Sequence, residues 1–163
     1  MKDSVYPLAV NVGEQLKRLG WQVALAESCT GGAIAQAMTD VPGSSVWFDR
    51  GFVTYSNAAK VDMLGVQQST LDSVGAVSQS TALEMATGAL AHSYANLAIA
   101  VTGIAGPDGG TPGKPVGTVF IAWQCRGQSA VCVRQHFSGD RLAVRRQVVE
   151  FCLRQLAKLI AER

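Results

Sequence analysis

The stretch that decides the fold runs from residue 21 to residue 39 and reads WQVALAESCTGGAIAQAMT. Residues 21–26 form a short apolar run with little alternation, which is typical of a strand buried on both faces of a sheet. A Gly-rich turn, Thr30-Gly31-Gly32, follows this strand, and residues 33–39 then have the composition of a helix. The order of strand, Gly-rich turn and helix predicts an α/β architecture with this turn at the end of a buried strand.

Strands and helices alternate on both sides of this stretch. Apolar residues at helical spacing predict a helix over residues 5–19, which Gly20 ends. Aromatic and β-branched residues predict a strand over residues 46–55. The other predicted elements are helices at 57–64, 69–74, 79–93 and from 138 to 161, and strands at 97–101, 116–124 and 129–137, the last two joined as a hairpin. This order predicts a three-layer α/β/α sandwich with a mixed sheet, in one domain spanning residues 1–163.

The composition favours a compact protein that acts on small molecules. Of the 163 residues, 48% are hydrophobic and 16% charged, so the chain can bury a full core. The net charge of +2 is too small for a nucleic-acid binder that neutralises phosphates. The longest apolar-leaning stretch, residues 90–101, is too short and too polar to span a membrane, and residues 1–7 lack the apolar core of a signal peptide. We therefore expect no nucleic-acid partner and no membrane partner.

The residue types that bind metals form no recognisable site. No two of the four cysteines form a CxxC pair, so a zinc ribbon is not expected. No cluster of His, Asp and Glu has the spacing of metal ligands, and we expect neither a metal nor a cofactor. Without an export signal, the thiols are expected to be reduced, which predicts a cytoplasmic protein. The cysteines are Cys29, Cys125, Cys132 and Cys152.

A hydroxyl and several backbone N–H groups come together where the first strand ends. Ser28 lies at the strand end, where a nucleophile would face a ligand. The N–H groups around Thr30, Gly31 and Gly32, with the positive end of the following helix, suit either a phosphate or the oxyanion of an attacked amide. A structural interpretation, a helix cap with glycines for tight packing, also explains the local pattern.

A serine nucleophile needs a base, and Lys60 is the best candidate for it. The only two histidines, His92 and His136, are expected to be surface or structural residues. Lys60 follows the aromatic strand on a short helix, and it can act as a base only if burial or a neighbouring cation lowers its pKa from about 10.4. Otherwise it is a solvated helix lysine. Cys29 is a rival nucleophile, although a buried structural cysteine at a helix start is the more common case.

Two further segments are candidates for holding a ligand. The glycine-rich loop at residues 102–115 follows a buried strand, and ligands collect at the carboxyl ends of strands in open α/β sheets. Within it, Gly103 and Asp108 are candidates, and Asp108 would orient a hydroxyl or meet a cationic ring; a plain turn is the structural alternative. Arg141 and Arg145 lie one helical turn apart near a helix start, where they suit a phosphate. The alternative for them is a pair of solvated arginines behind an ordinary cap.

Several segments in the same order resemble the CinA C-terminal domain family, the nicotinamide-nucleotide amidohydrolases. They are AESCTGG at 26–32, GSSVWFDRGFVTYSNAAK at 43–60, GAVS at 75–78, TGIAGPDGG at 102–110, KPVGTV at 114–119 and FSGDR at 137–141. The resemblance covers nearly the whole chain. It implies hydrolysis of nicotinamide mononucleotide to nicotinic acid mononucleotide and ammonia, in pyridine nucleotide recycling, by a Ser/Lys mechanism without a metal. Longer relatives in this family carry a further, pyrophosphatase-type domain, and the activity of that domain is not expected here.

The resemblance also implies roles for individual residues. Ser28 is expected to be the nucleophile and Lys60 the general base, with Ser45 as a competing or assisting hydroxyl and Tyr55 placed to orient Lys60 or the amide. The backbone around Thr30 and Gly31 is expected to hold the oxyanion. Gly103, Asp108, Arg141 and Arg145 are expected to position the ligand, and a homodimer is expected from the family habit and the apolar hairpin.

Two other functions remain open at this point. A binding or regulatory module for a nucleotide phosphate would explain the glycine-rich loops and Arg141 but leaves Lys60 without a role. A thiol amidase would use Cys29 in place of Ser28.

Overall fold

The segment from residue 21 to residue 39 forms the centre of the fold. In the computed structural model, which describes residues 3–163, β1 (Val23–Glu27) is buried along its whole length. It pairs in parallel with β2 (Phe48–Val53) on one side and with β3 (Leu97–Gly103) on the other. β4 (Thr118–Cys125) and β5 (Val131–His136) continue the sheet antiparallel, in the order β2-β1-β3-β4-β5. The predicted mixed sheet and hairpin are confirmed.

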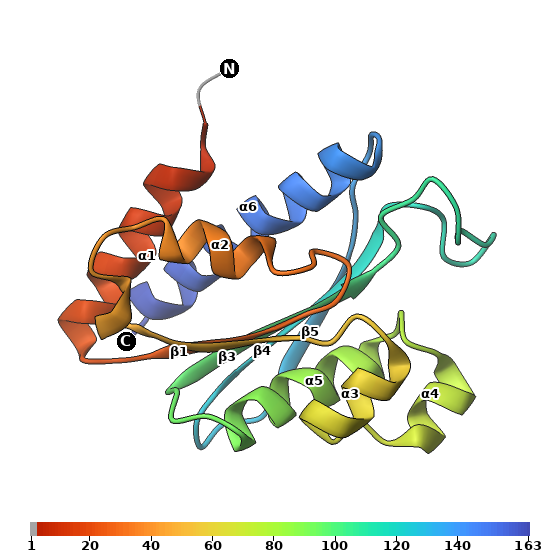
Figure 1. Ribbon diagram of the computed structural model, residues 1–163, viewed down its shortest axis with the longest axis horizontal. Helices are drawn as coiled ribbons and strands as arrows, with labels where there is room; N and C mark the ends of the chain where they lie inside the picture. Colours follow the sequence, from red (N-terminus) through yellow and green to blue (C-terminus); the bar gives the residue numbers. More distant parts are fainter. Residues whose placement is uncertain (1–2) are drawn as a thin grey trace.

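Helices cover both faces of this sheet (Figure 1). One layer contains α1 (Val5–Leu19), α2 (Ala33–Thr39) and α6 (Arg141–Ala161). The opposite layer contains α3 (Asn57–Leu64), α4 (Gln68–Val74) and α5 (Gln79–Ala91). The predicted three-layer α/β/α sandwich is therefore confirmed, with helix bounds within a few residues of those expected.

The size of the buried side chains differs between the two faces of the sheet. Along β1, Val23 and Leu25 belong to the core shared with α1, α2 and α6, whereas Ala24 and Ala26 belong to the core shared with α5. β3 repeats the pattern, with larger aliphatic residues on the first face and alanines on the second. Successive side chains in a strand point to opposite faces, so small residues let α5 pack closely against the middle of the sheet.

The strand predicted over residues 46–55 is shorter in the structure. A 3-10 helix, η1 (Ser44–Val46), precedes it, and β2 then covers Phe48–Val53. The chain leaves the sheet after Val53, and Thr54 and Tyr55 continue into α3. This early end matters for the site because it turns the backbone carbonyls of these two residues toward Lys60.

The carboxyl ends of the three parallel strands meet at one edge of the sheet. In Figure 1 this edge is on the right, below the start of α6 and beside the long loop that follows β3. Ser28 follows β1, Thr54 follows β2, and Gly103 ends β3. Ligands bind at such an edge in open α/β sheets, so the topology brings the segments singled out in the sequence together.

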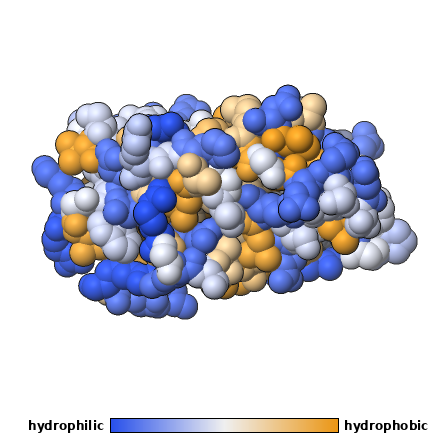
Figure 2. Space-filling view, turned by 90° about the horizontal axis from the view of Figure 1, so that it is seen from below, coloured by the Kyte–Doolittle hydropathy of each residue, from blue (hydrophilic) through white to orange (hydrophobic). Residues whose placement is uncertain are grey.

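The outer face of the α3–α5 layer is mostly hydrophilic, with hydrophobic side chains in small groups (Figure 2). Met63 and Val74 are among the exposed apolar residues of this layer. Within residues 3–163, no helix is long and apolar enough to cross a membrane. The signal-peptide prediction falls partly on Met1 and Lys2, which lie outside the described residues.

Candidate active site

Ser28 and Lys60 meet in the interior, at the end of β1. Ser28 is 8% exposed, and its backbone N–H donates to the carbonyl of Val101 at 3.2 Å. The Nζ of Lys60 lies 3.0 Å from the Oγ of Ser28. The predicted pairing of a serine hydroxyl with this lysine is therefore present in the geometry, across 32 residues of sequence.

Lys60 is almost completely buried, at 1% exposure, and makes no salt bridge in the part of the chain that the structure describes. Its Nζ also donates to the carbonyl oxygens of Thr54 at 2.9 Å and Tyr55 at 3.2 Å. Burial disfavours the charged ammonium and lowers the pKa of Lys60 from its ordinary value of 10.5. A neutral amine has two N–H donors and one lone pair, which match two carbonyls and one hydroxyl. The structure thus supplies the condition under which a lysine can act as a base.

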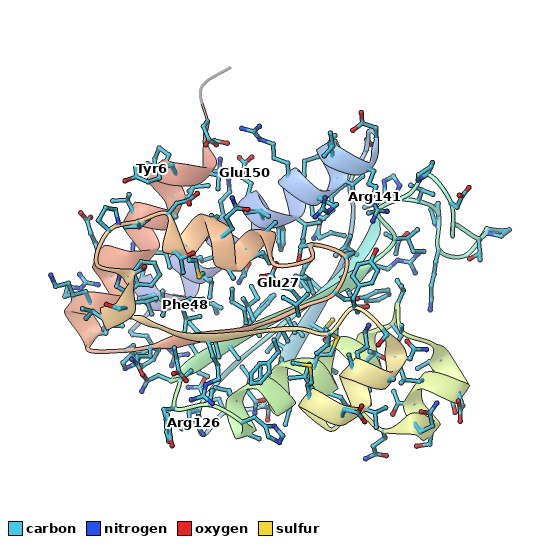
Figure 3. The ribbon with its side chains drawn as sticks, viewed as in Figure 1. Tyr6, Glu27, Phe48, Arg126, Arg141 and Glu150 are labelled. Carbon is cyan, nitrogen blue, oxygen red and sulfur yellow. The ribbon has the colours of Figure 1, made fainter. Side chains whose placement is uncertain are left out.

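The side chain of Glu27 caps the N-terminus of α2. This changes the expectation that the start of this helix offers free N–H groups to a ligand. The buried Glu27 carboxylate accepts hydrogen bonds from the Ile34 and Ala35 N–H groups at 2.9 Å and from the Thr30 hydroxyl at 2.6 Å. Figure 3 shows Glu27 between α2 and the sheet. The Ala33 N–H donates to the Thr30 carbonyl. The start of α2 is therefore occupied by the protein's own carboxylate and does not offer these N–H groups to a phosphate or an oxyanion.

The backbone groups expected to form the oxyanion site are also partly occupied. The Gly31 N–H donates to the Ser28 carbonyl at 3.0 Å, and Thr30 is fully buried. Gly32, with φ +101°, forms the N-cap of α2. Cys29, directly after Ser28, lines the same cavity. Its N–H, like that of Thr30, donates to no backbone carbonyl within residues 3–163, but of these two residues only Cys29 lines the cavity.

The Cys29 thiol itself is part of the core. It packs with the cluster between the sheet and the α1, α2 and α6 layer. Burial raises the pKa of the Cys29 thiol to about 11. A nucleophilic cysteine reacts as the thiolate, so the interior position of Cys29 disfavours the thiol amidase.

A cavity of about 290 Å³ lies against Ser28 and Lys60. This volume is just below the range of about 300–1,000 Å³ that small-molecule sites typically enclose. Gly103 has no room for a side chain, because a Cβ would lie 2.6 Å from Val119 Cγ2 and 2.8 Å from the Thr118 carbonyl oxygen. The walls of the cavity come from the turn after β1, the start of α3, the loop before α5, the loop after β3 and the start of α6. The lining residues include Tyr55, Asn57, Val77, Gly103, Asp108 and Arg141.

Arg141 and Tyr55 form one rim of the cavity. Arg141 Nη1 donates to the Gly106 carbonyl at 2.7 Å, and its Nη2 donates to the Tyr55 hydroxyl at 3.1 Å. Figure 3 shows Arg141 at the start of α6, beside the long loop. Tyr55 thus orients Lys60 through its backbone carbonyl, while its 60% exposed side chain is paired with Arg141. Asp108 lines the same rim and is exposed.

Two predicted site residues lie elsewhere. Ser45 is exposed on η1, before β2. Because β2 runs parallel to β1, the start of β2 lies at the sheet edge opposite Ser28, and Ser45 cannot assist it within this chain. Arg145 lines a separate groove between α2 and α6 and donates to carbonyls of the turn after Ser28, so it supports the turn and does not face the cavity.

The two histidines do not line the cavity. His92 Nδ1 lies 2.8 Å from the Gly88 carbonyl oxygen, and His136 Nε2 lies 3.0 Å from the Val116 carbonyl oxygen. Both rings are therefore satisfied by the backbone, as expected. Across residues 3–163, no three His, Cys, Asp or Glu side chains are arranged to hold a metal ion.

Lys114 is a contributor to the site that sequence reasoning missed. Its Nζ donates to the carbonyls of Val77 and Val74, which ties the long loop after β3 to the segment before α5. On the other side of the loop, Arg134 donates to the Gly113 carbonyl at 2.6 Å. The resemblance includes the segment that starts with Lys114, but no local pattern shows which carbonyls this lysine reaches.

Comparisons with known proteins identify the family and the fold. The CinA C-terminal domain family matches residues 5–160. A protein of Enterobacter agglomerans named nicotinamide-nucleotide amidohydrolase PncC is 54% identical over 149 residues, 91% of each chain. A Pseudomonas putida protein of the same name is 53% identical over 98% of this chain and 99% of its own. The crystal structure of the competence/damage inducible protein CihA from Agrobacterium tumefaciens superposes with a TM-score of 0.94, at 47% identity, over 98% of this chain and 97% of that one.

Proposed function

Because the chain belongs to the CinA C-terminal domain family, we propose that it is a nicotinamide-nucleotide amidohydrolase. Its substrate is nicotinamide mononucleotide, and its products are nicotinic acid mononucleotide and ammonia. The names of the full-length relatives support this activity. The observation that carries the proposal is the 3.0 Å contact between Lys60 Nζ and Ser28 Oγ, made by a buried lysine beside a cavity.

In the first half of the reaction, Lys60 acts as the base. The neutral amine takes the proton of the Ser28 hydroxyl as its Oγ attacks the carboxamide carbon. The Cys29 N–H stabilises the oxyanion of the tetrahedral intermediate. Lys60 then gives the proton to the amide nitrogen, the C–N bond breaks, and ammonia leaves an ester of Ser28.

In the second half, water hydrolyses this ester. Lys60, neutral again after the first half, takes a proton from the water, whose oxygen attacks the acyl carbon. When the second tetrahedral intermediate collapses, the bond to Ser28 Oγ breaks and Lys60 returns the proton to that oxygen. The product acid gives up its own proton to solvent as a carboxylate, and the enzyme is restored. The Thr54 and Tyr55 carbonyls hold the Lys60 amine in place in both halves.

The rim residues position the nucleotide. Arg141 presents a guanidinium that suits the phosphate, and Asp108 places a carboxylate where it can face the cationic pyridine ring. Gly103 lines the cavity at the end of β3, where the ring would lie. This arrangement needs no cofactor in the steps derived above.

The proposal extends to the setting of the enzyme. We place it in pyridine nucleotide recycling in the cytoplasm, as one domain over residues 1–163 that forms a homodimer. Light scattering on the purified protein tests the dimer. A non-catalytic nucleotide-binding module is the less favoured function, because it gives no reason for burying Lys60 against Ser28.

The test of the proposed function is incubation of the purified protein with nicotinamide mononucleotide. The expected result is release of ammonia in equal amount to nicotinic acid mononucleotide, with nicotinamide riboside hydrolysed more slowly because it lacks the phosphate. Binding of the nucleotide without turnover would instead support the binding module.

A further inference from the structure

The turn that follows Ser28 is held from outside the cavity by Arg145. Its Nε donates to the Cys29 carbonyl at 3.2 Å, and its Nη2 donates to the Thr30 carbonyl at 3.1 Å. We propose that Arg145 is a positioning residue of the amidase reaction, which aims the Cys29 N–H at the oxyanion by fixing the peptide planes of this turn. The inference rests on the proposed function and replaces a direct role of Arg145 in holding the ligand.

The peptide planes of the turn explain how a residue outside the cavity can act on the reaction. In a trans peptide the carbonyl and the N–H point in opposite directions. The Ser28 carbonyl accepts from the Gly31 N–H, so the Cys29 N–H of the same peptide points away from that bond. Arg145 fixes the next two peptides through the Cys29 and Thr30 carbonyls, and Gly31 is the residue that closes the turn. Arg145 therefore holds the turn in the form that leaves the Cys29 N–H unoccupied.

The glycines of the turn make such a support necessary. Gly31 has φ +59° and Gly32 has φ +101°, and glycine loses more conformational freedom on ordering than any other residue. A Cβ on Gly31 would lie 3.4 Å from Arg145 Nη2, so the guanidinium packs directly over this glycine. A cation that crosses from α6 thus packs against the turn at Gly31.

The same helix supports the opposite rim. Arg141, one helical turn before Arg145, lines the cavity and donates to the Gly106 carbonyl of the long loop. Arg145 lines the groove on the other side of the turn, with Gln36 and Leu142. Arg141 is placed to contact substrate, and Arg145 is placed to act through the backbone. Substitutions at the two positions should therefore have different kinetic effects.

The test compares Arg145→Met and Arg145→Lys with the matched control Arg146→Met, all in the full chain. Arg146 neighbours Arg145 on α6 and pairs with Asp3 at 3.2 Å on the surface. Because misplacing a reacting group by about 1 Å costs about 100-fold, we expect Arg145→Met to lower kcat about 10- to 100-fold. The KM should change by less than about threefold, since nothing that contacts substrate is removed. Arg145→Lys should retain part of the activity, and Arg146→Met should behave as wild type.

Two further readouts separate positioning from a loss of folding. Added methylguanidinium should restore part of the kcat of Arg145→Met, because it can bridge the same two carbonyls. The rate at which a fluorophosphonate labels Ser28, followed by intact mass, should fall in the same variant, and this readout does not depend on the natural substrate. Melting temperatures identify any variant that has lost its fold, and Arg145→Lys then carries the test.

The outcomes are distinguishable from failure of the proposed function. A raised KM with an unchanged kcat in Arg145→Met would mean that Arg145 contacts substrate, and equal labelling of this variant and wild type would overturn the positioning role. If wild type is labelled at Ser28 but releases no ammonia from nicotinamide mononucleotide, the proposed substrate is wrong, while slower labelling of Arg145→Met still supports positioning. A wild type that is neither labelled nor active contradicts both proposals.

Discussion

At the scale of single residues, Lys60 has the environment that departs most from the usual one for its type. Lysine is almost never fully buried without a charged partner, yet Lys60 is 1% exposed and is bonded to two carbonyls and one hydroxyl. Perturbed ionisable groups in a cleft are candidates for catalysis. Together with the serine hydroxyl beside it, this burial supports the proposed role of Lys60 as a base.

Replacing Lys60 by Met should remove the base. We expect kcat to fall at least about 100-fold, within the usual range for a general base. In wild type, kcat/KM should rise with pH as Lys60 loses its proton, at a pH below the ordinary lysine value because burial lowers the pKa of Lys60. A rate that stays pH-independent from pH 6 to 10 in wild type would contradict this assignment.

The stability of the same variant has a definite dependence on pH. Since the pKa of Lys60 is lowered in the folded state, the unfolded chain binds more protons between that pKa and 10.5. The free energy of unfolding from this group therefore rises with pH across that window. Urea unfolding over this pH range should show that the free energy of unfolding rises with pH in wild type and that this rise is missing in Lys60→Met. The same dependence on pH in both proteins would contradict the prediction.

Cys29→Ser should retain nearly full activity. The thiol, with a pKa of about 11, is protonated at neutral pH, and the proposed mechanism uses only the backbone N–H of this residue, which serine keeps. Steady-state ammonia release measures the effect, with Cys132→Ser as a control away from the cavity. Loss of activity in Cys29→Ser with a preserved melting temperature would revive the thiol mechanism.

Some of the site is visible in the sequence, and some is set by contacts that no local pattern shows. Ser28 and Lys60 stand out because a strand end, a glycine-rich turn and a lack of suitable histidines restrict the choices. The bond between Arg145 and Cys29 spans 116 residues, and it depends on how α6 crosses the turn. The position of Ser45 at the far edge likewise follows from the parallel pairing of β1 and β2.

At the scale of elements, the short helix α2 depends on a carboxylate from the strand before it. Glu27 accepts from the Ile34 and Ala35 N–H groups and from the Thr30 hydroxyl, which satisfies the free donors of the first helical turn. This contact also explains why β1 ends in a buried acid. The helix start serves the fold, and in the proposed mechanism the Cys29 N–H stabilises the oxyanion.

Glu27→Gln should destabilise the protein by about 1–3 kcal/mol, because an amide has one acceptor oxygen and leaves a buried donor without a partner. Chemical denaturation measures the change. Glu14→Gln, on the exposed side of α1, should stay within about 0.5 kcal/mol of wild type. A Glu27→Gln protein as stable as Glu14→Gln would contradict the capping role.

The order of elements was predictable, while the packing of the sheet was only partly so. The sequence of β1 shows an apolar run whose polarity does not alternate. In the structure its side chains alternate in size, with valine and leucine on one face and alanine on the other. Polarity alone cannot show which face receives a closely packed helix. The strand β2 also ends at Val53, before the predicted residue 55. The aromatic and β-branched composition used for that prediction continues into the loop that holds Lys60.

At the scale of the whole molecule, the cavity joins all three layers. Its lining residues come from the sheet ends, from α3 and the segment before α5 in one helical layer, and from the start of α6 in the other. A ligand in this cavity contacts both helical layers at once. Bound ligand should therefore stabilise the entire fold.

Nicotinic acid mononucleotide should raise the melting temperature accordingly. At a concentration of 100 times its Kd, it adds about 2.7 kcal/mol, or about 5–10 °C for a chain of this size. Arg141→Gln at the same concentration should show a smaller shift, because the phosphate loses its guanidinium partner. An equal shift in Arg141→Gln and wild type would place the phosphate elsewhere.

The most direct test of the whole account is steady-state ammonia release from nicotinamide mononucleotide by Ser28→Ala, with Ser45→Ala as the matched control. If Ser28 is the nucleophile that Lys60 activates, Ser28→Ala should lose at least about 1,000-fold in kcat while keeping its fold, and Ser45→Ala, altered at the opposite edge of the sheet, should turn over as wild type does. Near-normal turnover by Ser28→Ala would contradict the account.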